Sequence, residues 1–176
     1  MKWEVSTPPE GTIFTDDVLS LHLRLDTDAD LSLVQLYADA AVDYAQDAMG
    51  CSLLPQTITA TFYEHDHDKL FLPRGPITYI ISATDTNEKD VTFRRETYGH
   101  ADKLVPLVSF VAPLTVIYTA GYPDAAGIPA GIRAAILAHV GTLYDRRESV
   151  SDRANTVVPH SLDAFYAMKA RRTSIG

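Results

Sequence analysis

LTVIYTAGYPDAAGIPAGIRAAILAHVGTLYDRRE, residues 114–148, has the pattern of a strand, a turn and a long helix, and the rest of the chain is expected to pack around it. Residues 114–119 are rich in β-branched and aromatic side chains and predict a strand. Gly121, Pro123 and Gly127 are then typical of a turn. Pro129 begins a predicted helix over residues 129–148, because the first turn of a helix has no hydrogen bond to lose to a proline.

The predicted helix is apolar on more than one side. One stripe at helical spacing consists of Ile132, Ala135, Ile136, His139, Val140, Leu143 and Tyr144. The opposite face has Arg133 as its only charge, and a helix that is apolar nearly all round is buried on more than one side. We therefore expect a second subunit to cover this face, which consists of Arg133, Ala134, Leu137, Ala138 and Gly141. On the stripe, we expect His139 to be a hydrogen-bonded core or interface residue rather than a general base.

Length and composition indicate one globular domain with extensions. The chain has 176 residues, 46% of them hydrophobic, and we expect a soluble protein. No apolar run approaches the roughly 20 residues of a membrane span, and the N-terminus lacks the apolar segment of a signal peptide. The single cysteine, Cys51, excludes an internal disulfide and a multi-cysteine zinc site. We expect a cytosolic origin and no membrane association.

The negative charge is concentrated in the N-terminal part of the sequence. Residues 1–50 carry ten acids and two bases, whereas residues 51–176 carry thirteen of each, so the first 50 residues account for the net charge of −8. Such a surface repels phosphate. Tight binding of nucleic acid through this part is therefore not expected, although DNA could pass without sticking.

Two helices are predicted in the first 50 residues, after a polar N-terminal arm at residues 1–14. Thr15 is the expected N-cap of a short helix. A longer helix is predicted over residues 31–49, with Gly50 as its C′ residue. We expect its packed face to be Leu33, Leu36, Tyr37, Ala40, Tyr44 and Ala48. The acids Asp39, Asp43 and Asp47 form a row on the other face, which either is solvated or faces a channel or a basic partner.

The central part of the sequence predicts a small β-module. Six short strands are expected at residues 57–64, 69–72, 77–84, 91–96, 103–110 and 114–119. Because the strands are short and close together in sequence, we expect antiparallel pairing through hairpins. Helices, then strands, then a helix indicate an α+β fold.

A last amphipathic stretch follows a non-periodic segment that ends at Pro159. Ser161 is the expected cap, and Leu162, Phe165, Tyr166 and Met168 are set against Lys169, Arg171 and Arg172. A helix this short is not stable alone in water, so it must lie on something. Either it docks on a partner or it packs on its own domain.

The sequence offers one candidate for chemistry, the cluster His65-Asp66-His67-Asp68. Alternate residues of a strand share a face, so His65 and His67 could bind a metal together. The spacing implies no third ligand, and a polar run between two predicted strands is typical of a solvated hairpin tip. We therefore expect no metal, no cofactor and no enzymatic activity. A metal-dependent hydrolase, or a small binding module that uses this cluster, is the alternative.

Three stretches resemble the head-tail connector family of tailed bacteriophages, the adaptor or head-completion proteins. The first is the helical opening at residues 15–54, with its Leu23-Arg24-Leu25-Asp26 turn. The second is LFLPRGPI at residues 70–77, which is similar to the Leu-Pro-x-x-Pro turn of that family. The third and best match covers residues 116–148, with Tyr118-Thr119-Ala120-Gly121-Tyr122, Ile128-Pro129, Ile132, Ala135, Ile136, Tyr144 and Arg147-Glu148. The Pro-Tyr-Arg ending common in the family lacks its proline here.

The resemblance implies a structural virion protein of the neck, assembled in the host cytoplasm. Copies would form a twelvefold ring under the portal protein, extend the DNA channel, retain the genome and join the head to the next connector or tail-completion protein. DNA would pass through without specific binding. The C-terminal segment would engage the portal, with Leu162, Phe165, Tyr166, Lys169, Arg171 and Arg172 as the docking residues. The acids Asp39, Asp43 and Asp47 would line the channel.

The domain organisation expected from these patterns has three parts. Residues 1–14 are the arm, and residues 15–148 form one connector domain. That domain contains helices in residues 15–50, the β-module in residues 55–122 and the long helix at residues 129–148. Residues 149–176 are a loop and a docking segment.

Overall fold

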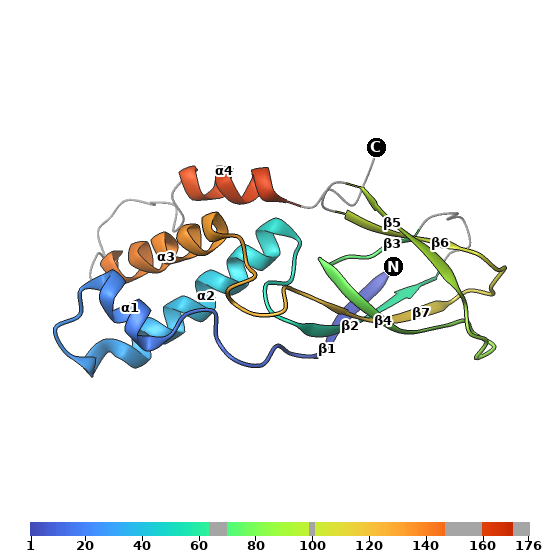
Figure 1. The fold of residues 1–176 in the computed structure, drawn as a ribbon, viewed down its shortest axis with the longest axis horizontal. Helices are drawn as coiled ribbons and strands as arrows, with labels where there is room; N and C mark the ends of the chain where they lie inside the picture. Colours follow the sequence, from blue (N-terminus) through green and yellow to red (C-terminus); the bar gives the residue numbers. More distant parts are fainter. Residues whose placement is uncertain (64–69, 99–100, 147–159, 171–176) are drawn as a thin grey trace. The chain divides into compact units, whose positions relative to one another are not determined.

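The computed structural model describes residues 1–63, 70–98, 101–146 and 160–170. These residues form two compact units, drawn in Figure 1. The β unit contains residues 1–11 and 50–123, and the helical unit contains residues 12–49 and 124–170. The α+β class expected from the sequence is confirmed.

The described residues of the helical unit form four α-helices and a 3₁₀ turn. They are α1 (Asp16–Leu23), η1 (Asp28–Asp30), α2 (Leu31–Met49), α3 (Ala130–Asp145) and α4 (His160–Lys169). The α2 and α3 helices pack against each other, and α1 and α4 each contact both of them. Thr15 is the N-cap of α1, since its side chain accepts a hydrogen bond from the Val18 N–H at 3.4 Å. Gly50, with φ of +61°, follows α2 as predicted.

The buried face of α2 differs from the predicted one. The residues of α2 that are buried are Val34, Ala38, Ala41, Ala45, Gln46 and Met49. Leu33, Leu36 and Tyr44, which were expected in the core, are exposed. Two helices approach each other most closely through small side chains. The alanines of α2 therefore meet α3, and the leucines on the neighbouring face are left outside.

In the part of the β unit that the structure describes, there are seven strands in two sheets. They are β1 (Lys2–Thr7), β2 (Gln56–Phe62), β3 (Leu70–Phe71), β4 (Ile77–Thr84), β5 (Phe93–Tyr98), β6 (Ala101–Pro106) and β7 (Leu114–Ala120). The sheet orders are β1-β2-β7-β4 and β3-β6-β5, and each described strand pair is antiparallel. Pairing through successive hairpins was the wrong expectation. The β5–β6 pair is a hairpin, but β7 lies between β2 and β4, which are far from it in sequence.

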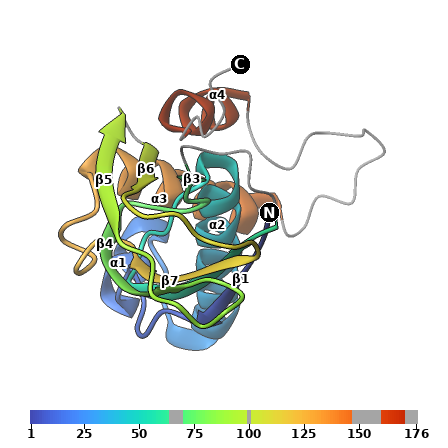
Figure 2. The same ribbon diagram turned by 90° about the vertical axis from the view of Figure 1, so that its right-hand side faces the viewer.

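Both sheets contribute to one hydrophobic core. Burial alternates along β2 and β7, so every second side chain points inward. The buried cluster includes Ile58, Val116 and Tyr118 from the larger sheet and Leu70 and Leu104 from the smaller one. Figure 2 shows the strands of the two sheets on opposite sides of this core.

Strand β1 was not predicted, because residues 1–14 were expected to be an arm without secondary structure. It is an edge strand that pairs with β2, and all six of its side chains are exposed. Trp3 lies over the guanidinium of Arg74, 5.1 Å from the ring centroid, and Arg74 in turn donates to the Cys51 carbonyl at 2.8 Å. The hydroxyls of Ser6 and Thr59 are also hydrogen-bonded between β1 and β2. Backbone pairing and polar contacts of this kind hold the strand, and they produce no hydrophobic pattern in the sequence.

Candidate interaction surfaces

The second face of α3 is only partly open. Ala134 and Ala138 are exposed, whereas Arg133 and Leu137 are half-buried. Gly141 lies close to α1 of the same chain: a Cβ atom at this position would be 3.5 Å from Nε2 of His22 and 3.9 Å from Cδ2 of Leu23. One of the five residues predicted to contact a second subunit is therefore already covered by the chain itself.

The guanidinium group of Arg133 has one N–H that makes no hydrogen bond within the described part of the chain. This N–H, at Nε, is buried. A buried guanidinium N–H without an acceptor is costly, since its hydration is lost and not replaced.

The acidic row of α2 is open to solvent. Asp39, Asp43 and Asp47 are all exposed, and Gln46 Nε2 donates to Asp43 at 3.5 Å. On the same outward side, Leu36 is 62% exposed and Leu33 is 37% exposed. The outward side of α2 therefore carries both apolar and acidic side chains. The sequence-based prediction had placed the leucines on the packed face instead.

Helix α4 packs on α2 and α3 of its own helical unit. The Tyr166 side chain is fully buried, and Tyr44 donates its hydroxyl proton to Asp163 Oδ1 at 2.6 Å. Phe165 is half-buried, and a Cβ atom built on Gly131 would lie 3.7 Å from its ring. The sequence left open whether this segment docks or packs back, and here it packs back.

Among the other predicted docking residues, Leu162 is half-buried and Lys169 is exposed. The Lys169 ammonium lies 5.9 Å from the centroid of the Phe165 ring. Arg171 and Arg172 lie outside the described residues.

His139 is a core residue of the helical unit, as expected, but its expected hydrogen bond is not found at Nδ1. That atom is buried without a partner among the described residues. The His139 ring instead packs edge-on against Tyr44, with ring centroids 5.3 Å apart, and lies 6.4 Å from the Tyr166 ring. Burial holds the pKa of His139 below its ordinary value, although the nearby Asp163 carboxylate acts in the opposite direction. The neutral imidazole is therefore favoured.

The phenols beside His139 are also held neutral. Burial raises the pKa of Tyr166 to about 12, with smaller contributions from Tyr44 and Asp163. The hydrogen bond to Asp163 raises the pKa of Tyr44, and burial adds to it. The Tyr166 hydroxyl is buried without a hydrogen-bond partner in the described chain.

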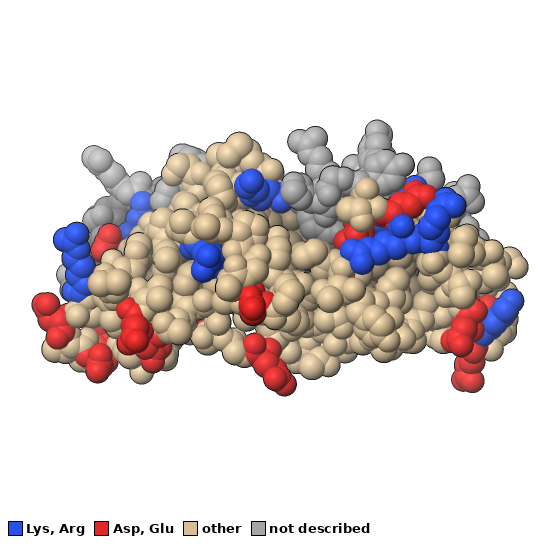
Figure 3. Space-filling model, viewed as in Figure 1, with Lys and Arg blue, Asp and Glu red and all other residues tan. Residues whose placement is uncertain are grey.

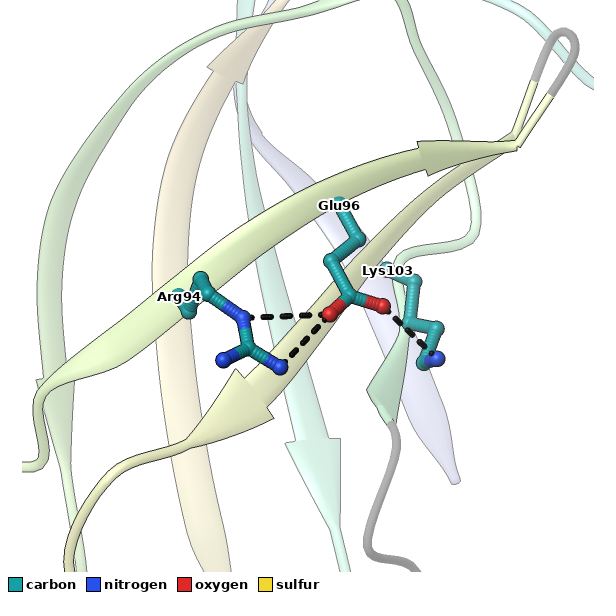
Figure 4. Close-up of polar contacts among 3 residues, drawn as sticks. All are labelled: Arg94, Glu96 and Lys103. Atoms are coloured by element: carbon teal, nitrogen blue, oxygen red, sulfur yellow. Dashed lines mark hydrogen bonds and ion pairs between the residues drawn. The ribbon is translucent and has the colours of Figure 1, made fainter.

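A charged network on β5 and β6 was missed by the sequence analysis. Figure 3 shows basic and acidic side chains together over these strands. Glu96 accepts hydrogen bonds from Lys103 Nζ at 3.0 Å and from Arg94 Nη2 at 2.7 Å (Figure 4). The hydrogen bond from Lys103, followed by that from Arg94, holds the pKa of Glu96 below its ordinary value. Arg94 and Glu96 share one face of β5 because they are two residues apart, whereas the β5–β6 pairing places Lys103 opposite Glu96. The sequence alone does not reveal this register.

Asp102 organises the buried side of the same hairpin. Its carboxylate accepts from the Ile77 N–H at 3.2 Å, from Arg95 Nε at 3.0 Å and from Thr97 Oγ1 at 3.1 Å. The Asp102 side chain is only 4% exposed. These contacts tie β4 to the β5–β6 hairpin, which indicates a structural role for the carboxylate.

The described residues include no group of three or more histidine, cysteine, aspartate or glutamate side chains placed to hold a metal ion. The cluster at residues 65–68 lies outside the described residues, so its metal-binding prediction stays a prediction. Within the described ranges, no helix is long and apolar enough to span a membrane.

Comparison with known proteins gives a structural match and no sequence match. No family model matches the chain, and no curated protein matches it. Three solved structures contain a chain of similar fold: the neck of the empty gene transfer agent (GTA) particle with C6 symmetry, the virion of the native GTA particle, and the neck of the native GTA particle with C12 symmetry. Their TM-scores are 0.79, 0.76 and 0.74 at 16%, 18% and 16% sequence identity.

Each match covers 100% of this chain and 99% of the neighbouring chain. The likeness therefore includes the helices and both sheets rather than one common motif. At the level of the fold, the resemblance to phage head-tail connectors expected from the sequence is confirmed: this chain has, over its full length, the fold of a chain from the neck of gene transfer agent particles.

Proposed function

We propose that this protein is a structural virion component, a head-tail connector in the neck of a phage-like particle. The observation that carries the proposal is the end-to-end likeness to chains from GTA necks. A shared fold alone does not imply a shared role. The support comes from the extent of the likeness, which covers 100% of this chain and 99% of the neighbouring neck chains. A catalytic role is not proposed.

In this role, copies of the chain form a ring beneath the portal, extend the DNA channel, retain the packaged genome and join head to tail. The C6 and C12 symmetries of the neighbouring neck structures support a ring arrangement. A contact between two different surfaces of one chain closes into a ring when its rotation allows. The excess of acids in residues 1–50 supports passage of DNA without binding, because it repels phosphate.

For contact with the portal protein, we keep α4 as the candidate segment. Its exposed residues, including Lys169, can meet a partner while Tyr166 anchors the helix on its own unit. Tyr166 itself is then a positioning residue rather than a contact. Charged Lys169 would act at the rim of such an interface.

The test is sedimentation velocity over a range of protein concentrations, with the chain alone and mixed with the portal protein of the same virus. A closed ring, or a complex with the portal protein that saturates at a fixed stoichiometry, is the expected result. A monomer that does not bind the portal protein at any concentration would overturn the proposal.

A further inference from the structure

Helices α2 and α3 pack against each other, and each has an exposed side as well as a buried one. The buried residues include Ala41 and Ala45 of α2 and Ile136 and Val140 of α3. By helical periodicity, the exposed residues lie on the far side of each helix from these buried ones. We call this side of α2 the α2 margin (Leu33, Leu36, Asp39, Ala40 and Asp43) and this side of α3 the α3 margin (Arg133, Ala134, Leu137 and Ala138).

The two margins are complementary in side-chain size. The α2 margin presents the bulky, exposed Leu33 and Leu36 one helical turn apart. The α3 margin presents Ala134 and Ala138, also one turn apart and exposed. Large side chains of one helix fit the depressions that small residues leave on another, as in ridges-into-grooves packing. Leucines exposed to this extent beside each other also favour a partner over water.

The margins are complementary in charge as well. Asp39 and Asp43 accompany the leucines on the α2 margin, and Arg133 borders the alanines on the α3 margin. The Arg133 Nε is buried without an acceptor in the described chain. That atom is closed off by the chain itself, but the Arg133 residue as a whole is only half-buried. A carboxylate from an α2 margin would pair with the accessible part of its charge, and charge-assisted pairs of this kind are among the stronger hydrogen bonds.

We propose that the α2 margin of one copy binds the α3 margin of the next copy, with Leu33 and Leu36 on Ala134 and Ala138 and with Arg133 paired to Asp39 or Asp43. This inference rests on the proposed ring and identifies its subunit contact. A symmetrical α2-to-α2 contact would place the acidic rows against each other, and like charges facing each other across an interface are unfavourable. The unlike margins instead give a head-to-tail contact, which is the kind that closes into a ring.

Cysteine cross-linking tests the contact directly, because the native Cys51 is buried and does not compete. One batch of protein carries Leu36→Cys and a second carries Ala138→Cys. Three samples are oxidised in the presence of portal protein: each batch alone, and the two batches mixed. We expect disulfide-linked dimers only in the mixture. A chain carrying both substitutions should give a ladder of linked oligomers. The control pair, Met168→Cys with Ala138→Cys, uses an exposed α4 residue and should give none.

Charge exchange provides a second measurement. Arg133→Glu should weaken assembly roughly tenfold or more, as expected for loss of an interfacial charge pair, and Asp43→Arg in the same chain should restore much of it. Lys89→Glu, an exposed position on the β unit, should leave assembly unchanged. Rescue by Asp43→Arg, or by Asp39→Arg in its place, supports the contact, and failure of both rescues together with absence of the mixed cross-link overturns it.

The failure of this inference can be told apart from the failure of the proposed function. If wild-type protein assembles with the portal protein but the mixed cross-link is absent, or Leu36→Cys links to itself, the proposed contact is wrong and the connector role stands. If wild-type protein neither assembles alone nor binds the portal protein, the connector role itself fails.

Discussion

At the residue scale, the hydroxyl of Tyr166 is buried inside an aromatic cluster and has no hydrogen-bond partner among the described residues. The Tyr166 ring lies 6.0 Å from the Tyr44 ring and 6.1 Å from the Phe165 ring. The ring itself stabilises the packing of α4, whereas a buried hydroxyl without a hydrogen bond opposes folding. The two parts of one side chain therefore act in opposite directions.

We predict that Tyr166→Phe raises the free energy of unfolding by about 1 kcal/mol, because the substitution removes the unsatisfied hydroxyl and keeps the ring. Urea denaturation followed by circular dichroism measures the change. Tyr44→Phe is the matched control, since it removes a hydroxyl that is hydrogen-bonded to Asp163, and it should lower stability slightly. A destabilised Tyr166→Phe protein would mean that the hydroxyl has a partner.

His139 makes stability depend on pH. Burial lowers the pKa of His139 in the folded protein. Below the ordinary histidine pKa, the imidazole is therefore protonated in the unfolded chain but stays largely neutral in the folded chain. Stability is therefore complete above that ordinary value and falls as the pH decreases through it. The groups that face His139 are Tyr44, Tyr166 and Asp163, and the Asp163 carboxylate reduces the effect without reversing it.

We predict that His139→Phe, which keeps an aromatic ring but cannot titrate, loses part of this acid sensitivity. Thermal unfolding of both proteins from about pH 8 to about pH 5.5, the range in which a histidine changes charge, measures the difference. The melting temperature of the wild type should fall more steeply on acidification. Parallel curves for the two proteins would contradict the assignment to His139.

At the scale of elements, Gly141 shows how a small residue lets one helix approach another. It lies inside α3, where glycine is unfavourable relative to alanine, and α1 approaches it closely. The distances from a Cβ atom at this position to His22 and Leu23, 3.5 and 3.9 Å, are ordinary van der Waals contacts. There is room for a methyl group but not for a branched side chain.

We predict that Gly141→Ala raises the free energy of unfolding by up to about 1 kcal/mol, through better helix propensity without a clash. Gly141→Leu should instead displace α1 and lower stability. Chemical denaturation of the two variants measures both effects. A loss of stability with alanine would mean that α1 lies closer to α3 than the structure places it.

Helix α2 illustrates the limit of reading an amphipathic pattern. Both of its sides contain apolar residues, so its range was predicted correctly and its buried face was not. The close approach of α3 selects the alanine side, and that choice leaves Leu33 and Leu36 available for a contact between copies.

At the scale of the whole molecule, the proposed connector role leads us to expect that substitutions of exposed residues at a subunit or portal contact change assembly and leave folding unchanged. Lys169 is exposed at the end of α4, where its charge faces solvent. Rim charges of this kind mainly change the association rate and its salt dependence.

We predict that Lys169→Glu slows association with the portal protein severalfold at low salt and leaves the melting temperature of the free chain unchanged. Surface plasmon resonance at two salt concentrations measures the rate. Met168→Gln, an uncharged change at an exposed neighbour, is the control and should leave the rate unchanged. An equal effect of both variants would remove the charge argument for α4.

The α+β class, the range of α2, the approximate ranges of most strands and the cap at Thr15 could be predicted from the sequence. So could the buried stripe of α3, of which five of the seven predicted residues are buried and Leu143 and Tyr144 are half-buried. These features depend on local propensity and periodicity, which neighbouring residues carry. Tertiary structure alone decided the order of the strands, the pairing of β1, the charged network around Glu96 and Asp102, and which side of α2 is buried. The Glu96 network depends on the register of the β5–β6 hairpin, which pairs Glu96 with Lys103. The other features depend on contacts between residues far apart in the chain, where small differences in side-chain size and hydrogen bonding choose among surfaces that have the same pattern in the sequence.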